Sequence, residues 1–162
     1  LKVVGHIPSY MTAERAINDG YDQVIHMNMI MLNFLGDTID TRSMGRFIKV
    51  AERARQIDTK GPAVARFIQL LKSRQIVVDP TMAIFEGMFT NEPGKMAAGY
   101  ETVASTLPPE VKRNLYRGGL PTMKGNEAAY KESFARMLEM IRLFHANGVT
   151  FLPGTDDSQR PH

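Results

Sequence analysis

The run Gln75-Ile-Val-Val-Asp79 is apolar between its two polar ends, and it sets the expected fold class. Three further runs are rich in β-branched or apolar residues and lead into polar ones: Lys2-Val-Val-Gly-His6, Gln23-Val-Ile-His26 and Val149-Thr-Phe-Leu152, which is followed by Pro153-Gly154-Thr155-Asp156. Unbroken apolar runs are typical of parallel strands covered on both faces. We therefore expect four parallel strands with polar chemistry at their C-terminal ends.

Helical signals occupy the intervals between these runs. One helix is predicted over 13–19, with Thr12 as its N-cap and Gly20 as its stop signal. Others are predicted after Ser43, from near Pro62, and from Asn126 to Asn147-Gly148, with these residues facing inward: Phe47, Val50, Ala51, Ala54, Phe67, Leu70, Leu71, Tyr130, Phe134, Met137, Leu138, Ile141 and Phe144. The order β-α-β-α-α-β-α-α-β predicts an α/β fold with right-handed crossovers. Half of a (β/α)8 barrel and an open doubly wound sheet both fit this order.

Length and composition narrow the function classes. The chain has 162 residues, 43% of them apolar, which predicts one domain with a real core. Its net charge of +3 is scattered rather than clustered, which argues against nucleic-acid binding, and no apolar run approaches the roughly 18 residues of a membrane span. Because the chain has no cysteine, any metal must be held by histidine and carboxylate. The strand-like start at Leu1 indicates a piece of a longer protein.

The segment 87–125 is the least regular part of the chain. It contains Pro93-Gly94, Pro108-Pro109 and Gly118-Gly119, which are turn and loop signals. We interpret it as an insertion after the third strand that would cover the site.

His6, His26 and Asp156 stand at or just past the ends of three of the expected strands. In a closed barrel these ends converge on one face, so residues far apart in sequence would share one ion. Imidazole nitrogen and carboxylate oxygen are both ordinary zinc ligands. A histidine at a strand end is equally explained by a structural hydrogen bond, and the spacing leaves both interpretations open.

Four short motifs in this order resemble the amidohydrolase superfamily, in particular its imidazolonepropionase-like and prolidase-like members: Gly5-His6-Ile7-Pro8, Ile25-His26-Met27-Asn28, Val77-Val-Asp-Pro-Thr81 and Gly154-Thr155-Asp156. The resemblance implies that residues 1–162 form the C-terminal half of a distorted (β/α)8 TIM-type barrel, supplying strands five to eight. It also implies that His6 and His26 are the metal ligands of strands five and six, and that Asp156 is both a metal ligand and the general base. The His-x-His pair of strand one and the lysine of strand four are absent, so the remaining N-terminal half of the barrel is an expected partner and the isolated piece is expected to be inactive.

The chemistry implied by the resemblance is hydrolysis of a C–N bond in an amide, a dipeptide or a cyclic amide. One or two divalent ions, with Zn²⁺ as first choice, would activate the attacking water. Asn28 is a candidate substrate-binding residue on the loop after the second strand. The alternatives are a phosphoester or lactone hydrolase on the same fold and a non-catalytic scaffold whose His and Asp cap strand ends. A nucleotide-binding sheet ranks last, because no Gly-x-Gly-x-x-Gly follows a strand.

The remaining polar and methionine-rich features have simpler interpretations. The stretch 27–35 either lines an adaptable pocket or, as we prefer, packs the interior. Asp79 is expected to cap a turn, and His145 to interact with the end of the last helix. Arg160 is a candidate for binding a substrate carboxylate. Four arginines are expected on a solvated helix face: Arg42, Arg46, Arg53 and Arg55.

Overall fold

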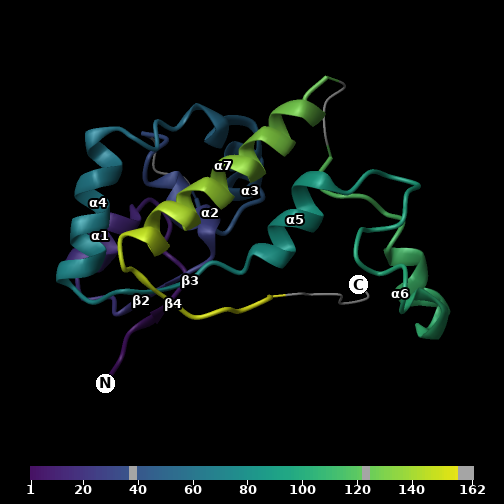
Figure 1. Cartoon of the computed structure of the whole chain (residues 1–162), viewed down its shortest axis with the longest axis horizontal. Coiled ribbons are helices and arrows are strands. Elements are labelled where there is room, and N and C mark those ends of the chain that lie inside the picture. Colours follow the sequence, from purple (N-terminus) through teal and green to yellow (C-terminus); the bar gives the residue numbers. More distant parts are fainter. Residues whose placement is uncertain (37–39, 122–124, 157–162) are drawn as a thin grey trace.

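The computed structural model describes residues 1–36, 40–121 and 125–156 (Figure 1). One layer of the fold is a sheet of four parallel strands in the order β1-β2-β3-β4. The strands are β1 (Val4–Gly5), β2 (Gln23–Ile25), β3 (Val77–Asp79) and β4 (Thr150–Phe151). The α/β class and the parallel pairing are therefore confirmed. His6 and His26 lie one residue past the ends of β1 and β2, at the same edge of the sheet.

Seven α-helices and two short 3-10 helices lie in the described ranges: α1 (Ala13–Asn18), α2 (Met27–Leu32), α3 (Gly45–Arg53), η1 (Ala54–Gln56), α4 (Pro62–Ser73), α5 (Met82–Thr90), η2 (Ala104–Thr106), α6 (Pro109–Asn114) and α7 (Glu127–Ala146). The structure confirms the helices predicted from about residues 13, 43, 62 and 126. The N-cap of α1 is also confirmed, since Thr12 Oγ1 accepts a hydrogen bond from the Arg15 amide at 3.1 Å. Helix α2 was not recognised as a separate element, because its apolar residues have no polar face to give a helical period.

The helices α1, α2, α3, α4 and α7 lie on one side of the sheet, above the strands in Figure 1. Right-handed crossovers between strands in sequential order place their helices on the same face. Val24 and Val78, paired across β2 and β3, are fully buried, whereas Val4 is 50% exposed. Within the described residues one face of the sheet is therefore buried and the other is only partly covered, whereas cover on both faces was predicted.

The core lies between the sheet and these helices. Its largest fully buried side chains include Phe67 of α4, Phe85 of α5 and Phe144 of α7. Methionines and isoleucine of α2 are also buried, at 0–2% exposure: Met27, Met29, Ile30 and Met31. The methionine-rich stretch thus packs the interior, as preferred above. Among the helices of the described residues, none is long and apolar enough to cross a membrane.

Candidate functional site

His6 and His26 meet at the C-terminal edge of the sheet. Their Nε2 atoms are 2.6 Å apart, and their rings are tilted by 49° with centroids 4.5 Å apart. The parallel pairing of β1 with β2 causes this meeting, because Gly5 lies beside Val24 and each chain leaves its strand within the next two residues. The sequence therefore brings two of the three predicted ligands into direct contact.

His26 is held in an unusual backbone conformation. Its φ is 68° and its ψ is 116°, in a region that residues with a side chain rarely adopt. Its amide donates to the Asp79 carbonyl at 2.8 Å, and the amide of Met27 donates to the Pro80 carbonyl at 3.1 Å. These bonds fix the turn from β2 into α2. A strained backbone costs about 1–3 kcal/mol and is typical of functional sites.

Thr81 fixes the other side of the His26 ring. Its Oγ1 lies 2.9 Å from Nδ1 of His26, and the threonine is 4% exposed with a left-handed φ of 47°. A hydroxyl at Nδ1 fixes the orientation of the ring, so Nε2 is left to face His6. The sequence analysis named Thr81 only as the last residue of a motif and did not predict its contact with His26.

Asp156 also reaches His26, but on the side away from His6. Its Oδ2 is 3.6 Å from Nδ1 of His26, and its side chain is 48% exposed. The three predicted ligands are therefore gathered in series, with His26 in the middle, rather than around a common centre. In agreement, the described part of the chain contains no group of three His, Asp or Glu side chains that could hold a metal ion.

The donor atoms of the histidine pair suit a divalent metal, but their spacing is that of a hydrogen bond. Two imidazole nitrogens on one tetrahedral zinc stand about 3.3 Å apart, so the pair would have to open by about 0.7 Å from its 2.6 Å separation. Side-chain rotation supplies movements of this size. His6 and His26 thus fit two positions of a metal site, and a third ligand must come from elsewhere or from a rotated Asp156.

Both histidines favour the neutral form. Burial lowers the pKa of His26, and the neighbouring His6 and Arg46 lower it further, whereas Asp156 and Asp79 raise it. Burial and Arg46 lower the pKa of His6, and Asp156 raises it. Since the ordinary value is 6.5, both rings are largely neutral at pH 7. Neutral imidazole is the form that binds metals.

Arg46 belongs to this site, which corrects the expectation that it lies on a solvated face. The residue is only partly exposed, and its charge lowers the pKa of both histidines. Arg42 and Arg55, by contrast, are exposed, and Arg42 pairs with Asp40 at 2.9 Å. The sequence carried no signal for this place of Arg46, because residues adjacent on a helix, such as Arg46 and Phe47, point in different directions.

Asn28 lies in the first turn of α2 rather than on a loop. It is fully buried, and neither polar atom of its side chain has a hydrogen-bond partner. The usual role of a loop asparagine, satisfying nearby backbone groups, is therefore absent. Its place two residues from His26 keeps it a candidate for the site.

Asp79 joins β3 to the segment that carries Asp156. Its Oδ1 accepts the amide hydrogen of Gly154 at 2.9 Å. A Cβ at Gly154 would stand 2.4 Å and 2.6 Å from the two carboxylate oxygens of Asp79. The carboxylate of Asp79 thus binds a segment 75 residues further along the chain, rather than capping its own turn as predicted, and residue 154 has no room for a side chain. Arg160 lies outside the described residues.

A cavity of about 570 Å³ opens between α5 and the segment 97–121. Ile84 and Met88 line it from α5, and Leu115, Leu120 and Tyr100 line it from the segment. Neither histidine nor Asp156 lines it. Its connection to them is indirect, because α5 begins directly after Thr81. The segment predicted to cover the site therefore builds a separate hollow beside it.

Comparison of the chain with protein-family models, curated proteins and solved structures found no match.

Proposed function

We propose that this chain serves metal-dependent hydrolysis of a C–N bond in an amide, a dipeptide or a cyclic amide. The observation that carries the proposal is the pair of Nε2 atoms that His6 and His26 direct at each other from adjacent strand ends. Their neutral state and their place at the C-terminal edge of a parallel sheet both support it.

We further propose that the sheet is half of a (β/α)8 barrel. The strands follow in strict sequential order, without the reversal that defines the ligand-binding crevice of a doubly wound sheet. Five helices, α1 to α4 and α7, lie on one face, and residues such as Val4 and Leu152 are left half-exposed, at 50% and 51%. Strands of the N-terminal half of the barrel would close the sheet on itself and cover the other face.

His6 and His26 would hold the ion, most simply Zn²⁺, through Nε2. A bound divalent ion lowers the pKa of water from about 15.7 to roughly 7 and polarises the scissile carbonyl. Thr81 keeps the His26 ring turned toward His6 through Nδ1. Asp156, beside His26 and half-exposed, accepts the proton of the attacking water and returns it to the leaving nitrogen.

A scaffold without catalysis is the second candidate. It is favoured by the series arrangement, since the two histidines bind each other through Nε2 and Thr81 occupies Nδ1 of His26 without a metal. In this case the pair simply ties β1 to β2. A phosphoester or lactone hydrolase would use the same edge of the sheet and differ only in substrate.

Zinc titration by calorimetry tests the proposal. We expect stoichiometric binding by the chain, and a loss of about a hundredfold or more in affinity for His6→Gln and His26→Gln. His145→Gln is the matched control, because its histidine is exposed at the end of α7. No zinc binding, or equal loss in all three variants, would reject the metal site. A panel of amides, phosphoesters and lactones, assayed with the zinc-loaded full-length protein that supplies the N-terminal half of the barrel, then separates the reaction classes.

A further inference from the structure

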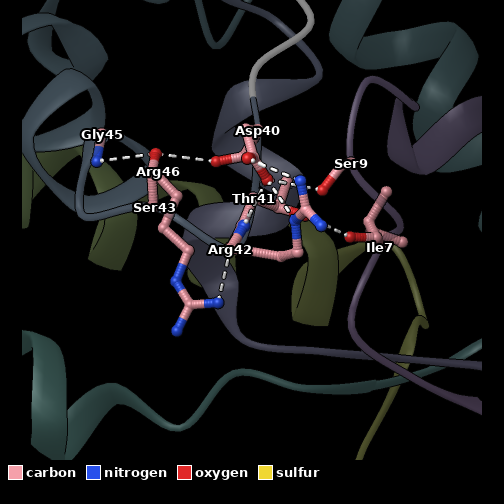
Figure 2. Close-up of polar contacts among 8 residues, drawn as sticks. All are labelled: Ile7, Ser9, Asp40, Thr41, Arg42, Ser43, Gly45 and Arg46. Carbon is pink, nitrogen blue, oxygen red and sulfur yellow. Dashed lines mark hydrogen bonds and ion pairs between the residues drawn. The ribbon is translucent and has the colours of Figure 1, made fainter.

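Arg46 is anchored in a polar network that joins the loop before α3 to the loop after β1 (Figure 2). Its Nη1 donates to the Thr41 carbonyl at 2.7 Å, and the Thr41 hydroxyl donates to the carbonyl of Ile7 at 2.8 Å. Ile7 directly follows His6. In Figure 2 the guanidinium extends out of this network, away from the pairing of Asp40 with Arg42. The backbone that carries His6 and the side chain of Arg46 are therefore positioned together.

One edge of the guanidinium is left without a partner. Nη1 is used by Thr41, but the buried Nε has no hydrogen-bond partner, and no bond of Nη2 occurs among the described residues. The Cζ atom lies 4.4 Å from the centroid of the Phe47 ring, which supports the plane of the group. Nε and Nη2 present two parallel N–H donors, which is the fork that a carboxylate accepts.

No acidic side chain of the described residues fills this edge. Asp40, from the same loop, is bound by Arg42 at 2.9 Å and 3.0 Å and by the Ser9 hydroxyl at 2.7 Å. Asp156 is close enough to influence the pKa of Arg46, but its carboxylate lies against His26 instead. A buried, charged N–H without an acceptor is costly, so its natural partner is an oxygen from outside the chain.

We propose that Arg46 binds a carboxylate of the substrate through its Nε and Nη2 edge and thereby selects amides that carry a free carboxylate, such as N-acyl amino acids and dipeptides. The assignment rests on the proposed function, since it places the substrate beside the histidine pair. A carboxylate fits better than a phosphate, because both accept the fork but one guanidinium balances only the single charge of a carboxylate. Arg46 is thus a specificity-determining residue that sequence analysis had placed in solvent.

The test compares two probes of the same shape, N-acetyl-L-leucine and N-acetyl-L-leucinamide, by calorimetric titration of the metal-free chain. We expect the wild type to bind the acid at least about tenfold more tightly than the amide. Arg46→Gln should abolish this preference, and Arg46→Lys, which keeps the charge but loses the fork, should reduce it. Arg66→Gln is the matched control, since Arg66 is exposed on α4 and its loss removes the same charge. Circular dichroism verifies the fold of each variant.

Several outcomes would overturn the assignment. Equal affinity of the wild type for acid and amide, or no binding of either, rejects it, as does an undiminished preference in both Arg46 variants. If phenyl phosphate binds more tightly than N-acetyl-L-leucine and this binding depends on Arg46, the ligand of Arg46 is a phosphate and the carboxylate assignment is rejected. The outcome of the zinc titration does not depend on the outcome of this acid–amide comparison, which uses the metal-free chain. A preference for the acid without zinc binding therefore rejects the metal site and leaves the Arg46 site standing.

Discussion

Replacing Gly154 by alanine tests how tightly the segment before Asp156 is held against the sheet. The new Cβ would stand 2.4 Å and 2.6 Å from the carboxylate oxygens of Asp79, well inside van der Waals contact. The φ of Gly154 lies outside the left-handed region, so alanine adds no backbone strain and the effect is purely steric. The same movement that relieves the clash breaks the 2.9 Å bond from the Gly154 amide to Asp79.

The expected loss of stability combines these two effects. Overpacking costs about 1–3 kcal/mol, and the lost hydrogen bond about 0.5–1.5 kcal/mol. We expect the free energy of unfolding to fall by about 2–3 kcal/mol, or the Tm by about 4–12 °C in a chain of this size. Urea denaturation followed by circular dichroism measures the change.

A double-mutant cycle isolates the contact. In an Asp79→Ala background the carboxylate is gone, so Gly154→Ala should change stability by no more than about 0.5 kcal/mol. Gly5→Ala is the control, because a Cβ there meets no atom within 4 Å. The reasoning is refuted if Gly154→Ala lowers the free energy of unfolding of the wild type by under about 0.5 kcal/mol. It is also refuted if the loss is the same in the wild type and in the Asp79→Ala background.

Two further predictions concern pH and assembly. Because the pKa values of His6 and His26 lie below 6.5 in the folded state, the unfolded chain binds more protons just below this pH. The free energy of unfolding should fall as the pH drops below 6.5 and level off below the folded pKa values, and His26→Gln should flatten this dependence in urea titrations across the range. The edge strands β1 and β4 each lack one neighbour among the described residues, and Leu152 beside them is 51% exposed. Sedimentation should show dimers or larger species that Leu152→Lys weakens, and a monomer at all concentrations would contradict this.

The sheet and the long helices could be predicted from sequence because their signals are local. Runs such as Gln75 to Asp79 are strand-like by composition, and α7 repeats its apolar residues at helical spacing over twenty residues. The short helices α2 and α6 carry only six residues each, too few for a period to appear. The partial cover of one face of the sheet was not predicted, because an apolar run shows that a strand is apolar but not what covers it.

The candidate site was predictable in its residues but not in its geometry. Strand ends identified His6, His26 and Asp156, and parallel pairing explains why the histidines meet. No spacing rule could show that Asp156 approaches Nδ1 of His26 rather than Nε2, because this depends on the turn after Leu152. Arg46 was missed for a related reason: helical periodicity separates faces, but a long side chain at the boundary of a face turns either way.

At His26 the stability of the turn and the presence of an imidazole ring favour different residues, because the backbone there has a positive φ. Glycine adopts such a φ without steric strain, so a glycine at position 26 would relax the main chain. It would also remove the imidazole ring. Selection for stability alone would therefore tend to erase the histidine, and selection for its ring would have to tolerate a weaker turn. Variants that relax residue 26 should thus be found among stabilised sequences that have lost the function of the pair.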